Sequence, residues 1–345
     1  MRRALAIAGA LGLASVACGV DATPPLQAPP PPTAEPIASV APSALDAGAD
    51  GLADASPEPT LAERIPKAVQ GAADAYDKHD ADAFAAYFAE NATVDVYGSP
   101  EGHGRGDVKK SVQAQLAAFP DDRATLLRTF QKKNVAIVEL VVSGTMRGDF
   151  LGVKASNKPV GDRRLVVARF GDDGLVTQWH EYVDVPGRLA QMKGASGAPP
   201  LPAAVASGPA EAHVAKGSPE EDRLVTWGKA MNDAMNKGDA KALLATYFAP
   251  DASATFYTLG GKELGGKALT SFDADFYRRA PKAKFEIVEA WGIDGYLVVE
   301  RVVTTQAPMH VAEVIQPAPG GGDPKIRHVW AYGNPAESTP PAPKK

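Results

Sequence analysis

A single cysteine, Cys18, occurs in the 345-residue chain, so no disulfide can form within it. There is no basic block, and the formal net charge is −5, which argues against nucleic acid as a partner. After the N-terminal segment, no apolar run is long enough for a transmembrane helix. The histidines and carboxylates lack metal-ligand spacing such as His-x-x-x-His, and no Gly-x-Ser-x-Gly motif is present. We therefore expect neither a metal ion nor a cofactor.

The one cysteine lies at the end of an export signal. Arg2 and Arg3 are followed by an uncharged apolar run, residues 4–17, which ends in small residues. This order is typical of a secretory signal peptide, and the run is too short to span a bilayer stably. The position of Cys18 resembles the lipobox of bacterial lipoproteins, in which the cysteine is acylated, although Ser15 stands where Leu is usual. An ordinary small-x-small cleavage site, which would give a soluble exported protein, is the alternative.

The expected location follows from this resemblance. We interpret residues 1–18 as a signal peptide and Cys18 as the lipidation site, so that the attached lipid makes a membrane the partner. Gly19 follows the cysteine, rather than the Asp that retains many lipoproteins at the inner membrane. In a Gram-negative host this predicts a place in the cell envelope, at the periplasmic face of the outer membrane.

Low-complexity segments divide the rest of the chain. Residues 19–59 are rich in Pro, Ala, Ser and Asp and contain no aromatic side chain. Because such a segment cannot bury enough apolar surface to offset its ordering entropy, we predict a disordered tether there. Similar composition predicts a linker at 194–217 and a disordered tail at 339–345. Two blocks of ordinary domain size remain, 60–193 and 218–338.

The two blocks repeat one another. Each opens with a capping-box pattern, Thr-x-x-Glu at 60–63 and Ser-x-x-Glu at 218–221, followed by apolar residues at helical spacing. The segment at 78–97, KHDADAFAAYFAENATVDVY, then parallels the segment at 237–257, KGDAKALLATYFAPDASATFY. Strand periodicity follows in both blocks, at 135–146, 164–170, 175–184, 284–290, 295–305, 309–316 and 325–332. Helices followed by long antiparallel strands predict an α+β fold in each block.

Several short motifs of block one follow the order of a known family. They are Phe119-Pro120-Asp121, Gly144-Thr145 with the run at 148–152, and the stretch from Trp179 to Asp184 that continues to Leu189 and Gln191. In this order they resemble the SnoaL-like polyketide cyclases, a branch of the nuclear transport factor 2-like superfamily that also holds the ketosteroid isomerases. The resemblance covers roughly 70–193 and, more weakly, block two. It implies two tandem cone-shaped α+β rolls, in which helices pack on a curved antiparallel sheet around a pocket.

The resemblance also implies which residues line the pocket. The family's late-strand acid, which removes a proton next to a carbonyl, falls on Asp184. Period two places Tyr182 and His180 on the same strand face as Asp184. We therefore take Asp184 as the candidate general base, with Tyr182 and His180 beside it. Tyr97, Trp179 and Phe150 are the candidate ligand contacts.

Some features depart from the family pattern. Met146 stands where the family usually has His. Trp179 lies five residues before Asp184 instead of an even number, which puts the two on opposite strand faces unless a bulge intervenes. Asp184 is also placed to cap the turn at 185–187. In block two Asn334 takes the place of the acid, so block two lacks a base.

Three functions therefore stay open. The first is an exported, lipid-anchored protein that binds a small, partly apolar or aromatic molecule in the first cone. The second is a cofactor-independent cyclase or isomerase that uses Asp184 as its base. The third is an envelope interaction or scaffold protein with vestigial pockets. Export favours the first, because polyketide and steroid intermediates are normally handled in the cytoplasm. The sequence leaves open whether the protein forms a homodimer.

Overall fold

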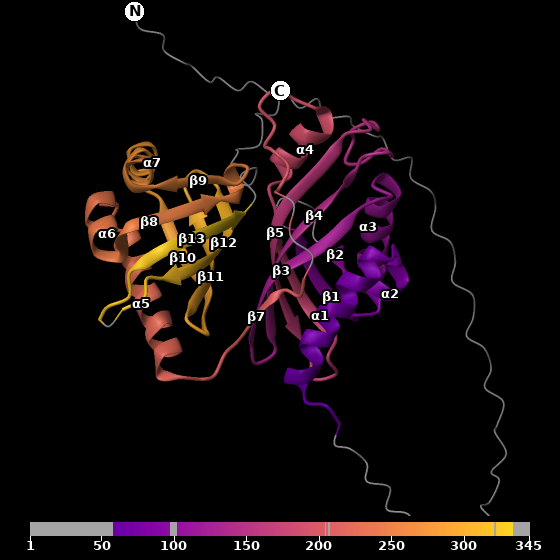
Figure 1. Cartoon of the computed structure of the whole chain (residues 1–345), viewed down its shortest axis with the longest axis horizontal. Coiled ribbons are helices and arrows are strands. Elements are labelled where there is room, and N and C mark those ends of the chain that lie inside the picture. Colours follow the sequence, from indigo (N-terminus) through magenta and orange to yellow (C-terminus); the bar gives the residue numbers. More distant parts are fainter. Residues whose placement is uncertain (1–57, 97–101, 204, 206–207, 321, 334–345) are drawn as a thin grey trace, which may run out of the picture. The chain divides into compact units, whose positions relative to one another are not determined.

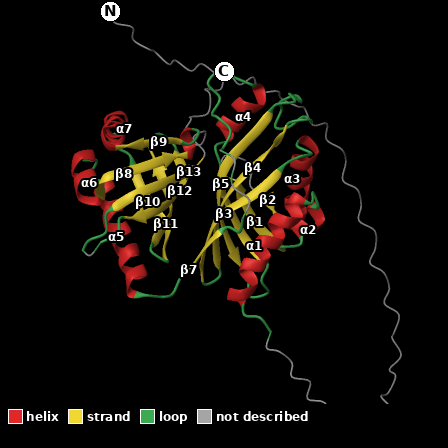
Figure 2. Cartoon of the chain, in the orientation of Figure 1, coloured by secondary structure: helices red, strands yellow, loops and turns green. Residues whose placement is uncertain are grey.

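Helices precede long strands in each half of the chain (Figure 1, Figure 2). The computed structural model describes residues 58–96, 102–203, 205, 208–320 and 322–333. From Pro59 to Gly333 these residues belong to one compact unit. The signal segment with Cys18, nearly all of the predicted tether and the predicted tail lie outside the described residues.

The first half begins with two capped helices. The carboxylate of Glu63 accepts a hydrogen bond from the backbone N–H of Thr60 at 2.8 Å, which closes the predicted capping box. Asp80 caps the second helix by accepting from the N–H of Ala83 at 2.9 Å. The elements of this half are α1 (Leu61–Asp77), α2 (Ala81–Ala85), β1 (Phe88–Val96), β2 (Gly102–His103), α3 (Gly104–Ala118), β3 (Arg123–Lys132), β4 (Val135–Thr145), β5 (Pro159–Phe170), β6 (Val176–Tyr182), α4 (Val185–Lys193) and β7 (Glu211–Val214).

The second half uses the same kind of caps at the same places in the repeat. Ser218 accepts from the N–H of Glu221 at 3.4 Å, and Asp239 accepts from the N–H of Ala242 at 2.9 Å. The elements of this half are α5 (Pro219–Met235), α6 (Ala240–Tyr247), β8 (Phe248–Phe256), the 3₁₀ turn η1 (Tyr257–Leu259), β9 (Lys262–Gly265), α7 (Gly266–Arg279), β10 (Lys284–Ile293), β11 (Tyr296–Thr304), β12 (Pro308–Pro317) and β13 (Ile326–Gly333).

Each half builds one sheet. The strand order is β2-β1-β6-β5-β4-β3-β7 in the first and β10-β11-β12-β13-β8-β9 in the second. In both sheets the last long strand returns to pair in parallel with the first, β6 with β1 and β13 with β8. The strands between them form an antiparallel meander. The structure therefore confirms a mixed α+β architecture with two sheets.

Three strands of the first sheet, β2, β3 and β7, were not predicted from the sequence, and β2 has only two residues. β3 has no clean alternation of polar and apolar residues, so the sequence pattern gave no strand at 123–132. β7 lies inside the segment predicted as a linker, 194–217, and pairs in parallel with residues 128–131 of β3. A four-residue strand is too short for periodicity to mark it. Some of the backbone hydrogen-bonding groups of that segment are therefore paired with β3.

The two faces of the first sheet meet different partners. The helices α1, α2 and α3 cover one face (Figure 1), and the other face packs on the second sheet through a shared apolar cluster that includes Phe130, Leu165, Trp291, Val298 and Val314. Glu139 and Glu300, the fifth residues of β4 and β11, lie buried in this contact. The hydroxyl of Tyr332 donates to Glu139, and that of Tyr182 donates to Glu300 at 2.6 Å. The repeat thus produces a reciprocal pair of tyrosine–glutamate hydrogen bonds.

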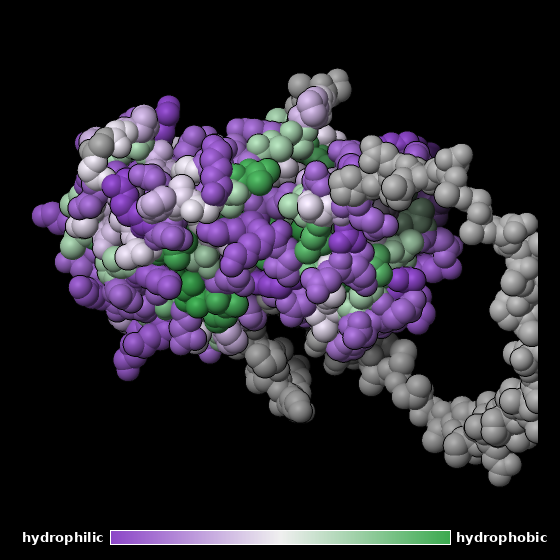
Figure 3. Space-filling view, turned by 90° about the horizontal axis from the view of Figure 1, so that it is seen from below, coloured by the Kyte–Doolittle hydropathy of each residue, from purple (hydrophilic) through white to green (hydrophobic). Residues whose placement is uncertain are grey.

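The described surface mixes polar and apolar side chains. Across the described ranges, every helix falls short of the length and hydropathy that a membrane span requires. On the face shown in Figure 3, polar residues surround small groups of apolar ones. The large apolar side chains that are most exposed lie on separate segments, namely Leu151, Leu201, Val214, Leu259 and Val288.

Candidate functional site

A cavity of about 570 Å³ lies between the first sheet and the helices that cover it. Alternate residues of β5, from Arg164 to Phe170, face it, because successive side chains of a strand point to opposite faces of the sheet. Val176, Trp179 and Glu181 line it from β6. Exposed residues of α3, such as Lys110 and Ser111, also line the cavity, so solvent reaches it along this helix. Most of its wall is apolar, with contributions from Val69, Phe84, Phe88, Leu126, Val138, Leu140, Phe150, Val166 and Ala168.

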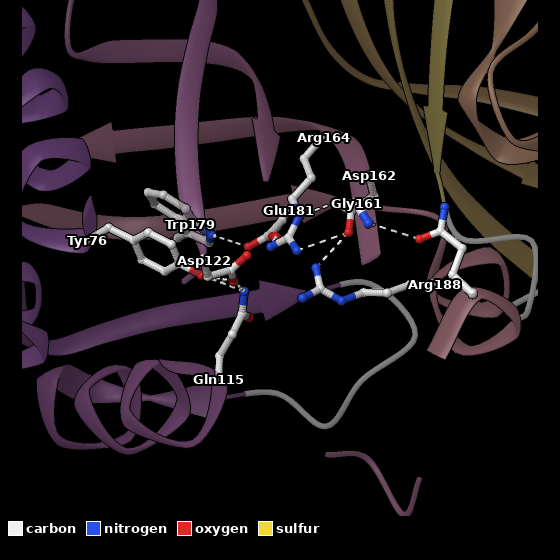
Figure 4. Close-up of polar contacts among 10 residues, drawn as sticks. Tyr76, Gln115, Asp122, Gly161, Asp162, Arg164, Trp179, Glu181 and Arg188 are labelled. Carbon is white, nitrogen blue, oxygen red and sulfur yellow. Dashed lines mark hydrogen bonds and ion pairs between the residues drawn. The ribbon is translucent and has the colours of Figure 1, made fainter. Parts of the chain in front are cut away.

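Charged side chains face this apolar space from β5 and β6 (Figure 4). The guanidinium of Arg164 donates to Oε1 of Glu181 at 2.7 Å. The indole N–H of Trp179 donates to Oε2 of the same carboxylate at 3.2 Å. Both oxygens of Glu181 are therefore held in a fixed orientation at the cavity wall.

The row of charges continues from Arg164 through Asp162 to Arg188, which also lines the cavity. Asp162 accepts from Arg164 through both oxygens and from Nη1 of Arg188, on α4, at 2.6 Å. Burial raises the pKa of Asp162 above its ordinary value. Although burial opposes it, the charges of Asp162 and Glu181 raise the pKa of Arg164 above that of a free guanidinium. Figure 4 shows Glu181, Arg164, Asp162 and Arg188 as one continuous row.

A second polar group lies beside this row. The hydroxyl of Tyr76 donates to Oδ2 of Asp122 at 2.7 Å, and the side-chain amide of Gln115 donates to the same oxygen at 2.8 Å. Tyr76 and Gln115 line the cavity, whereas Asp122 is fully buried behind them. Burial raises the pKa of the Asp122 carboxyl, and burial together with the neighbouring Asp122 raises the pKa of Tyr76.

The predicted trio of Asp184, Tyr182 and His180 does not face this cavity. Tyr182 and His180 point to the opposite side of β6 and contact Glu300 of the second sheet, His180 through Nδ1 at 2.9 Å. The predicted face was therefore wrong: Trp179 and Glu181 face the cavity, so His180 and Tyr182 between and after them face the opposite side. β6 ends at Tyr182, so the two-residue period does not extend to Asp184.

Asp184 starts a helix. Its Oδ1 accepts from the backbone N–H of Gly187 at 2.9 Å, which makes Asp184 the N-cap of α4, in agreement with the alternative capping role. Burial raises the pKa of Asp184 to about 6, although the hydrogen bond from Gly187 opposes the change. The base expected at this position is therefore directed toward α4 rather than toward the apolar cavity.

The predicted ligand contacts fall in two groups. Trp179 and Phe150 line the cavity. Tyr97 lies outside the described residues. Met146, which replaces the usual family His, is buried in a separate apolar cluster with Phe119.

Sequence reasoning missed the charged residues that do face the cavity. Trp179 was the available signal. Residues two apart in a strand share a face, so a ligand contact at Trp179 places Glu181 on the same face. Glu181 would follow from that choice. Val166 of β5 pairs with Glu181, and the alternation of β5 then adds Arg164, two residues from Val166, on the same face. Asp122 carries no such signal, since its position depends on how α1 and α3 pack.

The described part of the chain holds no cluster of metal-binding side chains. Among the residues that the structure describes, no group of three or more His, Cys, Asp or Glu side chains could hold a metal ion.

One family model matches the first half of the chain. It is described as SnoaL-like polyketide cyclase and matches residues 67–192. These residues make up about a third of the chain and extend from α1 to α4. No curated protein matches the chain.

Similar solved structures also cover little more than a third of the chain. A candidate SnoaL-like polyketide cyclase from Jannaschia sp. CCS1 is 15% identical, with a TM-score of 0.37 over 41% of this chain and 99% of its own. A hypothetical protein with a ketosteroid isomerase-like fold from Catenulispora acidiphila is 18% identical, with a TM-score of 0.34 over 38% of this chain and 95% of its own. SalBIII, described as an epoxide hydrolase/cyclase-like enzyme with a role in pyran ring formation in polyether salinomycin, is 16% identical, with a TM-score of 0.31 over 34% of this chain and 88% of its own.

Proposed function

We propose that the cavity of the first half binds a small, largely apolar molecule with one polar end. Its volume of about 570 Å³ is typical of small-molecule sites. The observation that supports this proposal most is that the cavity wall is mostly apolar but includes Arg164 and Glu181. These two residues offer a hydrogen-bond donor and an acceptor side by side. An apolar ring system would fill the space between Phe88 and Leu140, and its polar group would meet the charged pair.

Binding of 2-naphthol, measured by isothermal titration calorimetry, tests this proposal. Val166→Trp places an indole in the cavity and should abolish binding, because the added ring occupies the space of the ligand. Glu181→Gln should weaken binding by about tenfold, since the acceptor loses its charge. Gln178→Trp adds the same indole at an exposed position of β6 outside the cavity and serves as the matched control. Equal binding by the wild type and Val166→Trp would contradict the proposal.

A second candidate is acid–base conversion of the bound molecule, as in a cyclase or isomerase. The observation that favours it is the fixed carboxylate of Glu181, held through both oxygens by Arg164 and Trp179 at the wall of an apolar cavity. A base in such a place can remove a proton next to a carbonyl. Glu181 thus takes the role that the sequence assigned to Asp184.

Deuterium exchange separates the two candidates. With 2-tetralone as the probe, an enzymatic site should exchange the protons next to the carbonyl faster than buffer does. Glu181→Gln should abolish this exchange and leave binding within about 1–2 kcal/mol, because the shape of the side chain is nearly kept. If the wild type shows binding without exchange, the site is a binding site alone.

We also propose that this activity is located in the cell envelope. The support is the signal-like N-terminus that ends at Cys18 in the sequence. A tethered binding module would receive its ligand outside the cytoplasm.

A further inference from the structure

A second, smaller cavity is also lined by residues of α4. Its volume is about 290 Å³. It is formed by the first residues of β5, by α4, by residues 199–203 and by residues 255–261 of the second half. The polar side chains that line it are Asp162, Arg163, Asp184, Arg188, Gln191, Thr255 and Tyr257.

Arg188 lines both cavities and is the more deeply buried of the two arginines in the second one. Its side chain is 6% exposed, and Nη1 donates to Asp162 at 2.6 Å. Its Nε is buried and has no hydrogen-bond partner among the described residues. An unmade hydrogen bond on a buried cation is costly, so an acceptor supplied by a ligand would stabilise this arrangement.

Tyr257 offers another donor. Nη1 of Arg163 donates to the hydroxyl oxygen of Tyr257 at 2.8 Å, so the hydroxyl keeps its own proton for a further partner. Burial raises the pKa of Tyr257, which keeps that proton in place at ordinary pH. Asp184 faces the same space, with Oδ1 engaged by the N–H of Gly187.

The charged side chains that line the cavity are those of Arg163, Arg188, Asp162 and Asp184. Arg188 pairs with Asp162, and Arg163 pairs with Glu139. Burial raises the pKa of Asp184 to about 6. Below that pH Asp184 is neutral and no longer repels an anion in the cavity.

We propose that this second cavity binds a small carboxylate, which accepts from Arg188 and Tyr257 and shares a proton with Asp184. Arg163 and Arg188, the arginines that line the cavity, supply the attraction. When Asp184 is protonated it becomes a donor to the ligand. When it is ionised it repels the ligand. Binding should therefore weaken as the pH rises through the titration of Asp184.

The other groups around Asp184 do not titrate in the same way. Arg163 and Arg188 keep their charge at any ordinary pH. Both oxygens of Asp162 are occupied by arginines, although burial raises its pKa as well. His328 lies behind Thr255, with Nε2 3.0 Å from the threonine hydroxyl, and burial lowers its pKa. Asp184 is thus the group to which the pH response is assigned.

Titration of the full chain with acetate, followed by ¹H–¹⁵N NMR, tests the proposal. Acetate at pH 5 should shift the amide signals of Gly187, Gly260 and Gly261, which lie around the second cavity, and should leave that of Val166 in the first cavity unchanged. The dissociation constant should rise at least tenfold between pH 5 and pH 8. Acetamide, which is neutral and of the same shape, should produce no such shifts.

Two variants identify the groups involved. Asp184→Asn keeps an oxygen for Gly187 and replaces the titrating group with a permanent donor, so acetate binding should become independent of pH. Tyr257→Phe should weaken binding several-fold at both pH values. Asp172→Asn, in an exposed turn, is the control for a lost carboxylate. The proposal is overturned if acetate and acetamide act alike, if the shifts are confined to the first cavity, or if Asp184→Asn retains the pH dependence of the wild type.

Discussion

At the scale of single residues, Asp122 and Asp121 are neighbours with opposite electrostatic behaviour. Burial raises the pKa of Asp122. For Asp121, a hydrogen bond from the N–H of Thr145 at 2.7 Å lowers the pKa, although burial opposes it. The folded state therefore binds a proton at Asp122 more tightly than the unfolded chain does, and at Asp121 less tightly.

This contrast predicts opposite effects of two substitutions. The stability contributed at Asp122 falls as the pH rises from the unfolded value of about 4 through the higher folded value, so Asp122→Asn should be better tolerated at pH 8 than at pH 4.5, by about 1 kcal/mol. Asp121→Asn should cost stability at pH 7 and none at pH 2. Urea unfolding at each pH measures both. A larger loss for Asp122→Asn at pH 8 than at pH 4.5 would contradict the assignment.

At the scale of elements, α4 depends on its first residue. Asp184→Ala should lower the free energy of unfolding by about 1 kcal/mol, because the N–H of Gly187 loses its acceptor. Asp184→Asn should cost clearly less, since the amide oxygen can accept the same hydrogen bond. Urea denaturation at pH 5 compares the two variants. Equal losses would mean that the cap does not stabilise the helix.

The elements also show how much of the fold could be predicted from the sequence. The strands β4, β5, β6, β10, β11, β12 and β13 follow an apolar pattern that needs no tertiary information, and α1, α2, α5 and α6 follow their caps. β3 escaped prediction because its apolar residues do not alternate and a bulge between Leu126 and Arg128 shifts its register with β4. β7 has only four residues, and its place depends on pairing with β3. The site was harder to predict. Glu181 follows from the face of Trp179, but the end of β6 at Tyr182 depends on the cap of α4, and this misdirected the prediction for Asp184.

At the scale of the whole molecule, the two sheets are joined by buried polar bonds as well as by apolar packing. Tyr182→Phe and Tyr332→Phe each remove one hydroxyl that donates to a buried glutamate. Each should destabilise the protein by about 1–3 kcal/mol, because the carboxylate loses a donor and cannot reach water. Thermal or urea unfolding measures the loss, with Tyr247→Phe in the second half as the control. A change of only a few tenths of a kcal/mol would show that the reciprocal bonds do not hold the sheets together.

The location of the molecule rests on its N-terminus. Cys18→Ser should move the protein from the membrane fraction to the soluble fraction of the host cell, since the thiol that carries the lipid is lost. Fractionation and mass spectrometry of the mature N-terminus measure this. A wild-type protein that is soluble and carries a free thiol at Cys18 would contradict the lipid anchor.

The central claim is that the first cavity receives a small apolar molecule whose polar end meets Arg164 and Glu181. A crystal structure of the protein soaked with 2-naphthol tests it most directly. The account predicts the ring system within the cavity, beside Phe88 and Trp179, with its hydroxyl within hydrogen-bond distance of Glu181. A cavity filled by the protein's own side chains, or naphthol bound only elsewhere, would contradict it.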